Sequence, residues 1–268
     1  MKKKYQKFYN DILDYYTREG RHNLPWRKKQ TPYYVAVSEI MLQQTQVDRV
    51  IPFFKNWMQR FPSWRSLANA PQPEVLRVWK GLGYNSRALR LQKLAQTVTE
   101  DYKGKLPTDY TELQKLPGIG PYTAGAIRAF AFDLYTPLIE TNIRRIFIHH
   151  FFAGRGCVTD TEIMEKMSEF GEISNPREWY AALMDYGSTL PKILKRNPNK
   201  QSKHYSRQSK FAGSDRQIRG KVLDILLEQK TVPREQLYKT LYFVLNPKEQ
   251  KDVTGEHERY EKILAQLE

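Results

Sequence analysis

The chain has little of what builds disulfide-linked, metal-clustered or membrane-spanning proteins. Cys157 is the one cysteine among 268 residues, so the sequence excludes an internal disulfide and any cysteine-ligated cluster. No apolar run reaches the roughly 20 residues that a transmembrane helix needs. The basic opening Met1-Lys2-Lys3-Lys4 lacks the apolar stretch that follows in a secretory signal. We therefore expect a soluble protein of a reducing, intracellular compartment.

Several common catalytic signatures are also missing. His149 and His150 have no third ligand at metal-binding spacing, so we expect no metal site. The sequence contains neither a Ser-x-x-Lys motif nor a nucleophile elbow. Acidic residues are the scarcer charged class: 44 Lys and Arg against 29 Asp and Glu give a net charge of +15. Such an excess is typical of a protein that binds a polyanion. A basic amphipathic anchor is lacking, which favours nucleic acid over a membrane surface.

Alternating, strand-like runs are scarce, whereas apolar residues recur at helical spacing along most of the chain. We predict an all-α fold without internal repeats. The apolar periodicity predicts helices over 34–47, 75–79, 89–98, 122–132, 143–152 and 179–186. The predicted divisions are a body over 1–190, a basic segment over 191–214 and a small helical C-terminal unit over 215–268, for which a winged-helix type is one option.

The segment 191–214 is basic and contains no acid before Asp215. Its positive residues are Lys192, Lys195, Arg196, Lys200, Lys203, Arg207 and Lys210. The composition fits a DNA-facing loop, with a solvated tether as the alternative.

A glycine-bent turn over 116–126 is the most sharply specified connection. Gly118 and Gly120 permit positive φ and a close backbone approach, so the amides around Ile119 to Tyr122 can point at a phosphate at the start of the next helix. An ordinary helix–helix connection would use the same residues. The turn predicts a contact to a nucleic-acid backbone through Gly118, Gly120 and Thr123.

Glu39 lies in an apolar segment that has no Lys or Arg from Thr31 to Val47. Helical spacing over 34–47 would align Glu39 with Gln43 and Gln46 on one stripe, which is either a solvated face or a functional one. Desolvation among apolar neighbours would favour the protonated carboxyl, so we predict a general acid at Glu39.

Glu140 has the opposite setting, because it directly precedes a predicted helix whose N-terminus favours an ionised carboxylate. Plain helix capping is the alternative, and Thr141 or Asn142 could also cap. Two carboxyls held in different protonation states are what cleavage of a glycosidic bond requires: one protonates the leaving group and the other faces a cationic sugar. The leaving group could be a nucleobase.

The run from Trp79 to Ala88 places Leu82 and Tyr84 on a glycine-loosened loop that ends in a basic helix with Arg87. Core packing explains such side chains, and so does a wedge that unstacks base pairs.

Together these residues resemble the helix-hairpin-helix DNA glycosylase superfamily, and within it the MutY-type adenine DNA glycosylases. The resemblance spans roughly residues 24–187. It is carried by Leu24-Pro25-Trp26-Arg27, by Ser38-Glu39-Ile40-Met41-Leu42-Gln43-Gln44-Thr45-Gln46-Val47, by Gly81-Leu82-Gly83-Tyr84, by the turn over 116–126 and by Met184-Asp185-Tyr186-Gly187.

This resemblance implies a two-lobed helical fold in which Glu39 protonates adenine at N7, while Gln44 and Tyr84 belong to loops that penetrate the duplex. Tyr122 stands where bifunctional relatives carry a Schiff-base lysine, which implies inefficient strand cleavage. The expected catalytic residues are Glu39, Tyr122, Glu140 and Asn142. The expected DNA-binding residues are Gln43, Gln44, Leu82, Tyr84, Arg87, Gly118, Gly120, Thr123 and Arg144.

Three features depart from the family's pattern. Glu140-Thr141-Asn142 stands where an aspartate followed by glycine and asparagine is usual, so an added methylene changes the reach of the carboxylate. The four cysteines of the iron–sulfur cluster are absent, so we expect no cofactor, and the lysine-rich segment occupies their place. The usual Nudix-like domain, which reads 8-oxoguanine, is replaced by residues 215–268.

The sequence thus predicts a monomeric, monofunctional glycosylase that removes adenine mispaired with 8-oxoguanine or guanine in double-stranded DNA. Two alternatives stay open. One is a thymine or uracil glycosylase acting on mispairs with guanine, and the other is a DNA-lesion binder without catalysis.

Overall fold

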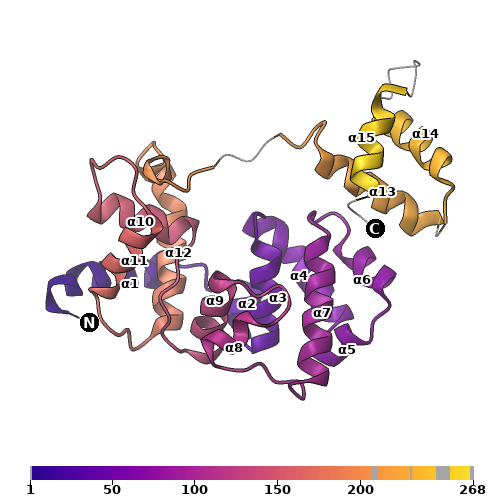
Figure 1. Ribbon diagram of the computed structural model, residues 1–268. Coiled ribbons are helices and arrows are strands. Elements are labelled where there is room, and N and C mark those ends of the chain that lie inside the picture. Colours follow the sequence, from indigo (N-terminus) through magenta and orange to yellow (C-terminus); the bar gives the residue numbers. More distant parts are fainter. Residues whose placement is uncertain (1, 207–209, 230, 246–253, 266–268) are drawn as a thin grey trace. The chain divides into compact units, whose positions relative to one another are not determined.

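The computed structural model describes residues 2–206, 210–229, 231–245 and 254–265 (Figure 1). The chain forms two compact units: residues 1–69 with 90–206, and residues 70–89 with 207–268. Residues 70–89, which the sequence analysis placed in the body, are thus grouped with the C-terminal helices. Throughout the described residues the regular elements are helices, which confirms the all-α fold. None of the described helices is long and apolar enough to cross a bilayer.

Two helices, α3 and α12, make most of the helix–helix contacts of the first unit. Helix α3 contacts α4 and α9, while α12 contacts α1, α9 and α10. The elements are η1 (Lys3–Tyr5), α1 (Gln6–Glu19), α2 (Pro25–Lys28), α3 (Pro32–Leu42), α4 (Val47–Arg60), α5 (Trp64–Ala68), α7 (Ser86–Glu100), α8 (Tyr110–Gln114), α9 (Pro121–Phe132), α10 (Thr141–Phe151), α11 (Asp160–Ser168), α12 (Pro176–Ile193) and η2 (Pro198–Gln201), with the first residues of α7 belonging to the second unit.

Helix α3 ends at Leu42 and α4 begins at Val47, so the predicted continuous helix over 34–47 is wrong at residues 43–46. The C-cap Gln43 leaves the helical conformation with ψ 114°, and Gln44 follows in a left-handed conformation with φ 54°. The apolar spacing continues across the break, which is why periodicity alone missed it. Gln43 and Gln46 therefore do not extend a helical stripe from Glu39.

The glycine turn joins α8 to α9 as a helix hairpin. Gly118 has φ 78°, the positive value that the sequence analysis expected. Gly120 has φ −89° and is the N-cap of α9, so it does not use the positive φ that glycine permits. Pro121 follows at the first helical position, where its fixed φ suits the start of a helix.

Helices α10 and α12 approach each other closely at Gly187. A Cβ on Gly187 would lie 2.9 Å from the Asn142 Cβ and closer still to the Asn142 carbonyl oxygen. Only glycine fits without moving one helix. The contact fixes the start of α10 against the middle of α12.

The second unit holds α6 (Gln72–Trp79), α13 (Asp215–Gln229), α14 (Arg234–Leu245) and α15 (Thr254–Leu264). Its C-terminal helices enclose an apolar cluster of Ile218, Val222, Ile225, Leu237, Tyr238, Leu241, Tyr242, Tyr260, Ile263 and Leu264. Lys80 pairs with Asp224 at 3.1 Å, which ties the loop after α6 to α13. The unit is helical as predicted, and its described residues contain no strand pair of a winged-helix type.

We expect Gly187→Ala to lower the free energy of unfolding by roughly 1–3 kcal/mol, because its methyl group would press on the backbone of α10. Chemical denaturation of the full chain measures this. Gly156→Ala is the matched control, since a Cβ there meets no atom within 4 Å, and its effect should stay within about 0.5 kcal/mol. Equal stabilities of the two variants would contradict the close contact.

Candidate active site

Glu39 lies near the middle of α3, a helix in which Tyr33 and every residue from Val35 to Met41 are buried. The Glu39 side chain is 7% exposed. Tyr122 Oη donates a hydrogen bond of 2.8 Å to Glu39 Oε2. Burial raises the pKa of Glu39 to about 7; the Tyr122 bond opposes this, and the charge of Glu140 adds to it. The shift is in the direction that the sequence predicted, toward a carboxyl that holds its proton up to about neutral pH.

Tyr122 stands in the first turn of α9, directly after the glycine hairpin. Burial, with the charges of Glu39 and Glu140, raises its pKa well above the usual value of a phenol. The phenol consequently stays protonated and donates. The hairpin thus brings Tyr122 to Glu39, which lies 83 residues earlier in the chain.

Glu140 is the N-cap of α10, as the sequence analysis considered. Its Oε1 accepts hydrogen bonds from the backbone N–H of Asn142 at 2.7 Å and of Ile143 at 2.9 Å. Burial raises the pKa of this carboxyl above its usual value and outweighs the lowering by those two amides and by the charges of Arg145 and Arg144. The expectation of an ionised Glu140 rested on the helix N-terminus alone and did not include the upward effect of burial on the pKa.

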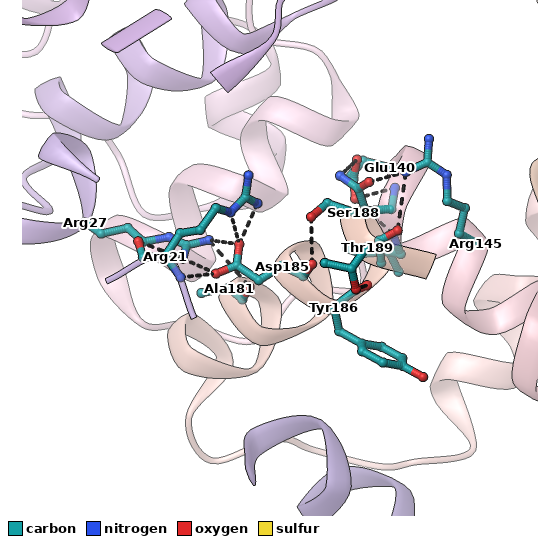
Figure 2. A network of polar contacts seen from close by, with 12 residues as sticks. Arg21, Arg27, Glu140, Arg145, Ala181, Asp185, Tyr186, Ser188 and Thr189 are labelled. Carbon is teal, nitrogen blue, oxygen red and sulfur yellow. Dashed lines mark hydrogen bonds and ion pairs between the residues drawn. The ribbon is translucent and has the colours of Figure 1, made fainter. Parts of the chain in front are cut away.

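The Asn142 side chain links Glu140 to the guanidinium of Arg145. Its Nδ2 donates to Glu140 Oε2 at 3.2 Å, and its Oδ1 accepts from Arg145 Nη1 at 2.5 Å. Figure 2 shows Arg145 beside Glu140. Arg145 was not among the residues predicted for the site, although its spacing of three from Asn142 on one helix face was a usable signal.

The structure therefore brings together all four residues expected to be catalytic. Glu39 comes from α3, Tyr122 from α9, and Glu140 with Asn142 from the start of α10. The charge of Glu140 acts on Glu39 and on Tyr122. The arrangement combines a carboxyl whose pKa is near neutrality with a second carboxyl that accepts two amide hydrogen bonds, which suits acid-assisted bond cleavage.

A second polar network holds the N-terminal segment against α12. Asp185 is 2% exposed and accepts from Arg27 Nη1 at 2.6 Å, Arg27 Nη2 at 2.9 Å and Arg21 Nε at 2.7 Å. Figure 2 shows both arginines converging on Asp185. Burial raises the pKa of Asp185, but the bonds and charges of Arg27 and Arg21 outweigh it and hold the pKa below its usual value. Arg27 also lowers the pKa of Glu39.

The residues expected to bind DNA in the first unit differ in accessibility. Gln44 is exposed and Gln43 is half-buried in the turn after α3. Thr123 is 3% exposed, so its side chain does not reach solvent and only its backbone N–H at the start of α9 suits the predicted role. Arg144 makes a two-pronged bond to Asp160, at 2.7 and 2.8 Å, so the guanidinium already has a carboxylate partner.

In the second unit, the residues expected to bind DNA also differ in accessibility. Leu82 is 4% exposed, so it packs in the unit and does not project as a wedge. Arg87 is 5% exposed, and burial lowers its pKa to about 10. Tyr84 is partly exposed with φ 50°, and its Oη accepts from Arg216 Nη1 at 3.0 Å. Tyr84 alone keeps the accessibility that the prediction required.

Part of the basic segment packs as ordered structure. Asn199 and Ser202 are buried, and Asn199 Nδ2 donates to the Thr141 carbonyl at 2.9 Å. Its described basic side chains are exposed, at Lys192, Lys195, Arg196, Lys200, Lys203 and Lys210, while Arg207 lies outside the described residues. The tether interpretation is therefore wrong for residues 197–203.

Comparison with known proteins identifies the family of this chain. A family model described as "HhH-GPD superfamily base excision DNA repair protein" matches residues 37–172. The chain belongs to this superfamily. The adenine DNA glycosylase of Mycolicibacterium smegmatis is 34% identical over 246 residues, which cover 85% of this chain and 83% of the relative. That of Buchnera aphidicola subsp. Baizongia pistaciae is 39% identical over 192 residues, covering 71% of this chain and 54% of the relative. The relatives place the chain with the MutY-type adenine DNA glycosylases, as the motifs predicted.

The chain spans about half the length of the Buchnera relatives. Among solved structures, a thermostable thymine-DNA glycosylase matches with a TM-score of 0.62 and 24% identity over 76% of this chain and 97% of that one. Endonuclease III in a non-covalent DNA complex matches with a TM-score of 0.55 and 18% identity over 80% and 92%. These likenesses confirm the helix-hairpin-helix glycosylase fold.

The superfamily's iron–sulfur cluster does not fit this chain. One cysteine cannot supply the four thiolates that hold such a cluster. Cys157 is exposed, and the described residues contain no group of three His, Cys, Asp or Glu suited to a metal ion.

We expect Asp185→Asn to lower the free energy of unfolding by about 3–5 kcal/mol, because it leaves two arginines beside a buried site without their counter-charge. Thermal or chemical unfolding measures the loss. The control Glu112→Gln removes an exposed pair with Lys115 and should cost at most about 1 kcal/mol. Because the folded pKa of Asp185 is depressed, its contribution is present at neutral pH and is lost as pH falls through that pKa.

Proposed function

We propose that this protein is a monofunctional DNA glycosylase that hydrolyses the N-glycosidic bond of adenine mispaired with 8-oxoguanine or guanine. The observation that carries the proposal is the pairing of Glu39, whose pKa lies at about 7, with the amide-supported Glu140. The adenine DNA glycosylases among the relatives support adenine as the base.

In the proposed reaction, the Glu39 hydroxyl gives its proton to N7 of the flipped adenine. The bond between N9 and C1′ then breaks, and both bonding electrons leave with the base. The Glu140 carboxylate stabilises the positive charge that develops on the sugar. Water adds its oxygen to C1′ and releases a proton, so the products are free adenine and an abasic site.

Tyr122 supports the monofunctional part of the proposal. A lysine amine could attack C1′ and form a Schiff base that leads to strand cleavage. Tyr122 instead donates to Glu39, and its phenol has a pKa well above the usual value, so it is a poor nucleophile.

The net charge of +15 supports double-stranded DNA as the partner. Gly118 and the start of α9 supply backbone amides for a phosphate, and Gln44 presents an exposed side chain beside the end of α3. We propose that the exposed lysines of the basic segment add phosphate contacts and that the activity needs no metal cofactor.

A panel of mispaired duplexes under single-turnover conditions tests the function. We expect base release from adenine opposite 8-oxoguanine or guanine, with strand breaks appearing only after alkali. Glu39→Gln should lose at least about 100-fold in rate and retain DNA binding, because a general acid acts on the barrier while phosphate contacts set affinity. Release of thymine or uracil opposite guanine in place of adenine would overturn the substrate, and strand nicking without alkali would overturn the monofunctional assignment.

The pH dependence follows from the setting of Glu39. The acid must be protonated, so the single-turnover rate should fall as pH rises through about 7. Tyr122→Phe removes a hydrogen bond that lowers the pKa of Glu39, so the alkaline fall should move to higher pH. Tyr110→Phe is the control, because Tyr110 bonds a backbone oxygen on the hairpin and not a carboxyl. An unchanged profile in Tyr122→Phe would contradict this role.

A further inference from the structure

The segment from Asn197 to Lys203 is fastened to the first unit at several points. The Val158 N–H donates to the Gln201 carbonyl at 2.7 Å, and the Lys203 N–H donates to the Val158 carbonyl at 2.9 Å. Asn199 is 4% exposed and its side chain bonds the Thr141 carbonyl, the first residue of α10. The segment therefore rests against the end of α10 that carries Glu140.

Asn197 extends this attachment to a side chain of the candidate site. Its Oδ1 accepts hydrogen bonds from Arg145 Nε at 3.2 Å and from the Asn199 N–H at 3.1 Å. Both are acceptor contacts at one oxygen. The Asn199 N–H fixes where that oxygen lies, and the oxygen in turn holds Nε of Arg145.

The contact between Asn197 and Arg145 also fixes the orientation of the Asn142 side chain. A guanidinium is planar, so holding Nε sets the direction of Nη1, which donates to Asn142 Oδ1. A guanidinium only donates, so it selects the amide orientation in which Oδ1 faces Arg145. The Nδ2 of Asn142 is then left to donate to Glu140 Oε2. Without Arg145, a flipped amide would set its oxygen against the carboxylate.

We propose that Asn197 is a positioning residue for Glu140, acting through Arg145 and Asn142. The inference rests on the proposed function for its kinetic consequence and on geometry for its structural one. It gives the segment that follows α12 a second role, distinct from phosphate binding: it orients the carboxylate that faces the sugar.

The kinetic test compares two substitutions at one position. Asn197→Ala removes the acceptor and should lower the single-turnover rate of base release by roughly 10- to 100-fold, because small misplacements of reacting groups have effects of that size. DNA affinity should change less than about threefold. Asn197→Asp keeps an acceptor oxygen for both contacts and should restore most of the rate. Asn175→Ala is the matched control, since Asn175 is exposed and its side chain caps nothing.

A second readout is independent of activity. Carboxyl NMR on the free protein follows the titration of Glu140, assigned with Glu140→Gln. Glu39 and Tyr122 face this carboxyl from α3 and α9, and Arg144 and Arg145 from α10. Arg145 lowers the pKa of Glu140, so its release in Asn197→Ala should raise that pKa, while Asn197→Asp should leave Arg145 in place.

The outcomes separate the two proposals. A slower rate and a raised Glu140 pKa in Asn197→Ala, with rescue by Asn197→Asp, support the positioning role. An unchanged rate and titration in Asn197→Ala overturn it. It is also overturned if rate, affinity and melting temperature fall together without rescue, because that result describes a purely structural residue. Absence of base release by the unaltered protein on every mispair overturns the proposed function, and the Glu140 titration then still decides the positioning role.

Discussion

The desolvation of Glu39 is the constraint on which the candidate site depends. A carboxyl on a helix packed on all sides loses the water that would stabilise its charge, so its pKa rises to about 7. Tyr122 limits the rise by donating a hydrogen bond. Burial on α3 thus raises the pKa of Glu39, and the Tyr122 hydrogen bond lowers it. The resulting pKa suits a general acid near neutral pH.

The other half of the site depends on how α10 begins. Gly187 lets α12 approach the Asn142 backbone, and Glu140 then caps the helix with the same oxygen that receives two amide hydrogens. In the MutY-type glycosylases, an aspartate is usual at the position of Glu140. Glutamate has a longer side chain, and in this chain it still reaches the amides of residues two and three positions on. Asn142 donates a hydrogen bond to the second oxygen, and Arg145 in turn donates to Asn142.

Particular residues show how far the sequence could be interpreted. The helical periodicity and the glycine turn predicted the all-α fold and the hairpin, because both are local properties. The prediction that Glu39, Gln43 and Gln46 share one helical stripe was wrong, because the backbone breaks around the left-handed Gln44. The apolar periodicity of the sequence continues into α4 and does not reveal this break. Leu82 and Thr123 were expected at a DNA surface, and packing buries both side chains. Burial of a single side chain depends on neighbours far away in the chain, which spacing does not reveal.

The sequence by itself determined the charge, the helical class, the family motifs and the two carboxyls, because these follow from residue type and local spacing. Only the tertiary structure decided which groups meet. Tyr122 reaches Glu39, Arg21 and Arg27 meet at Asp185, and Asn197 reaches Arg145 across 52 residues of chain. These contacts join segments far apart in the sequence, and their partners are chosen by the packing of helices around a shared core. The same packing removes water from the carboxyls and so sets their pKa values.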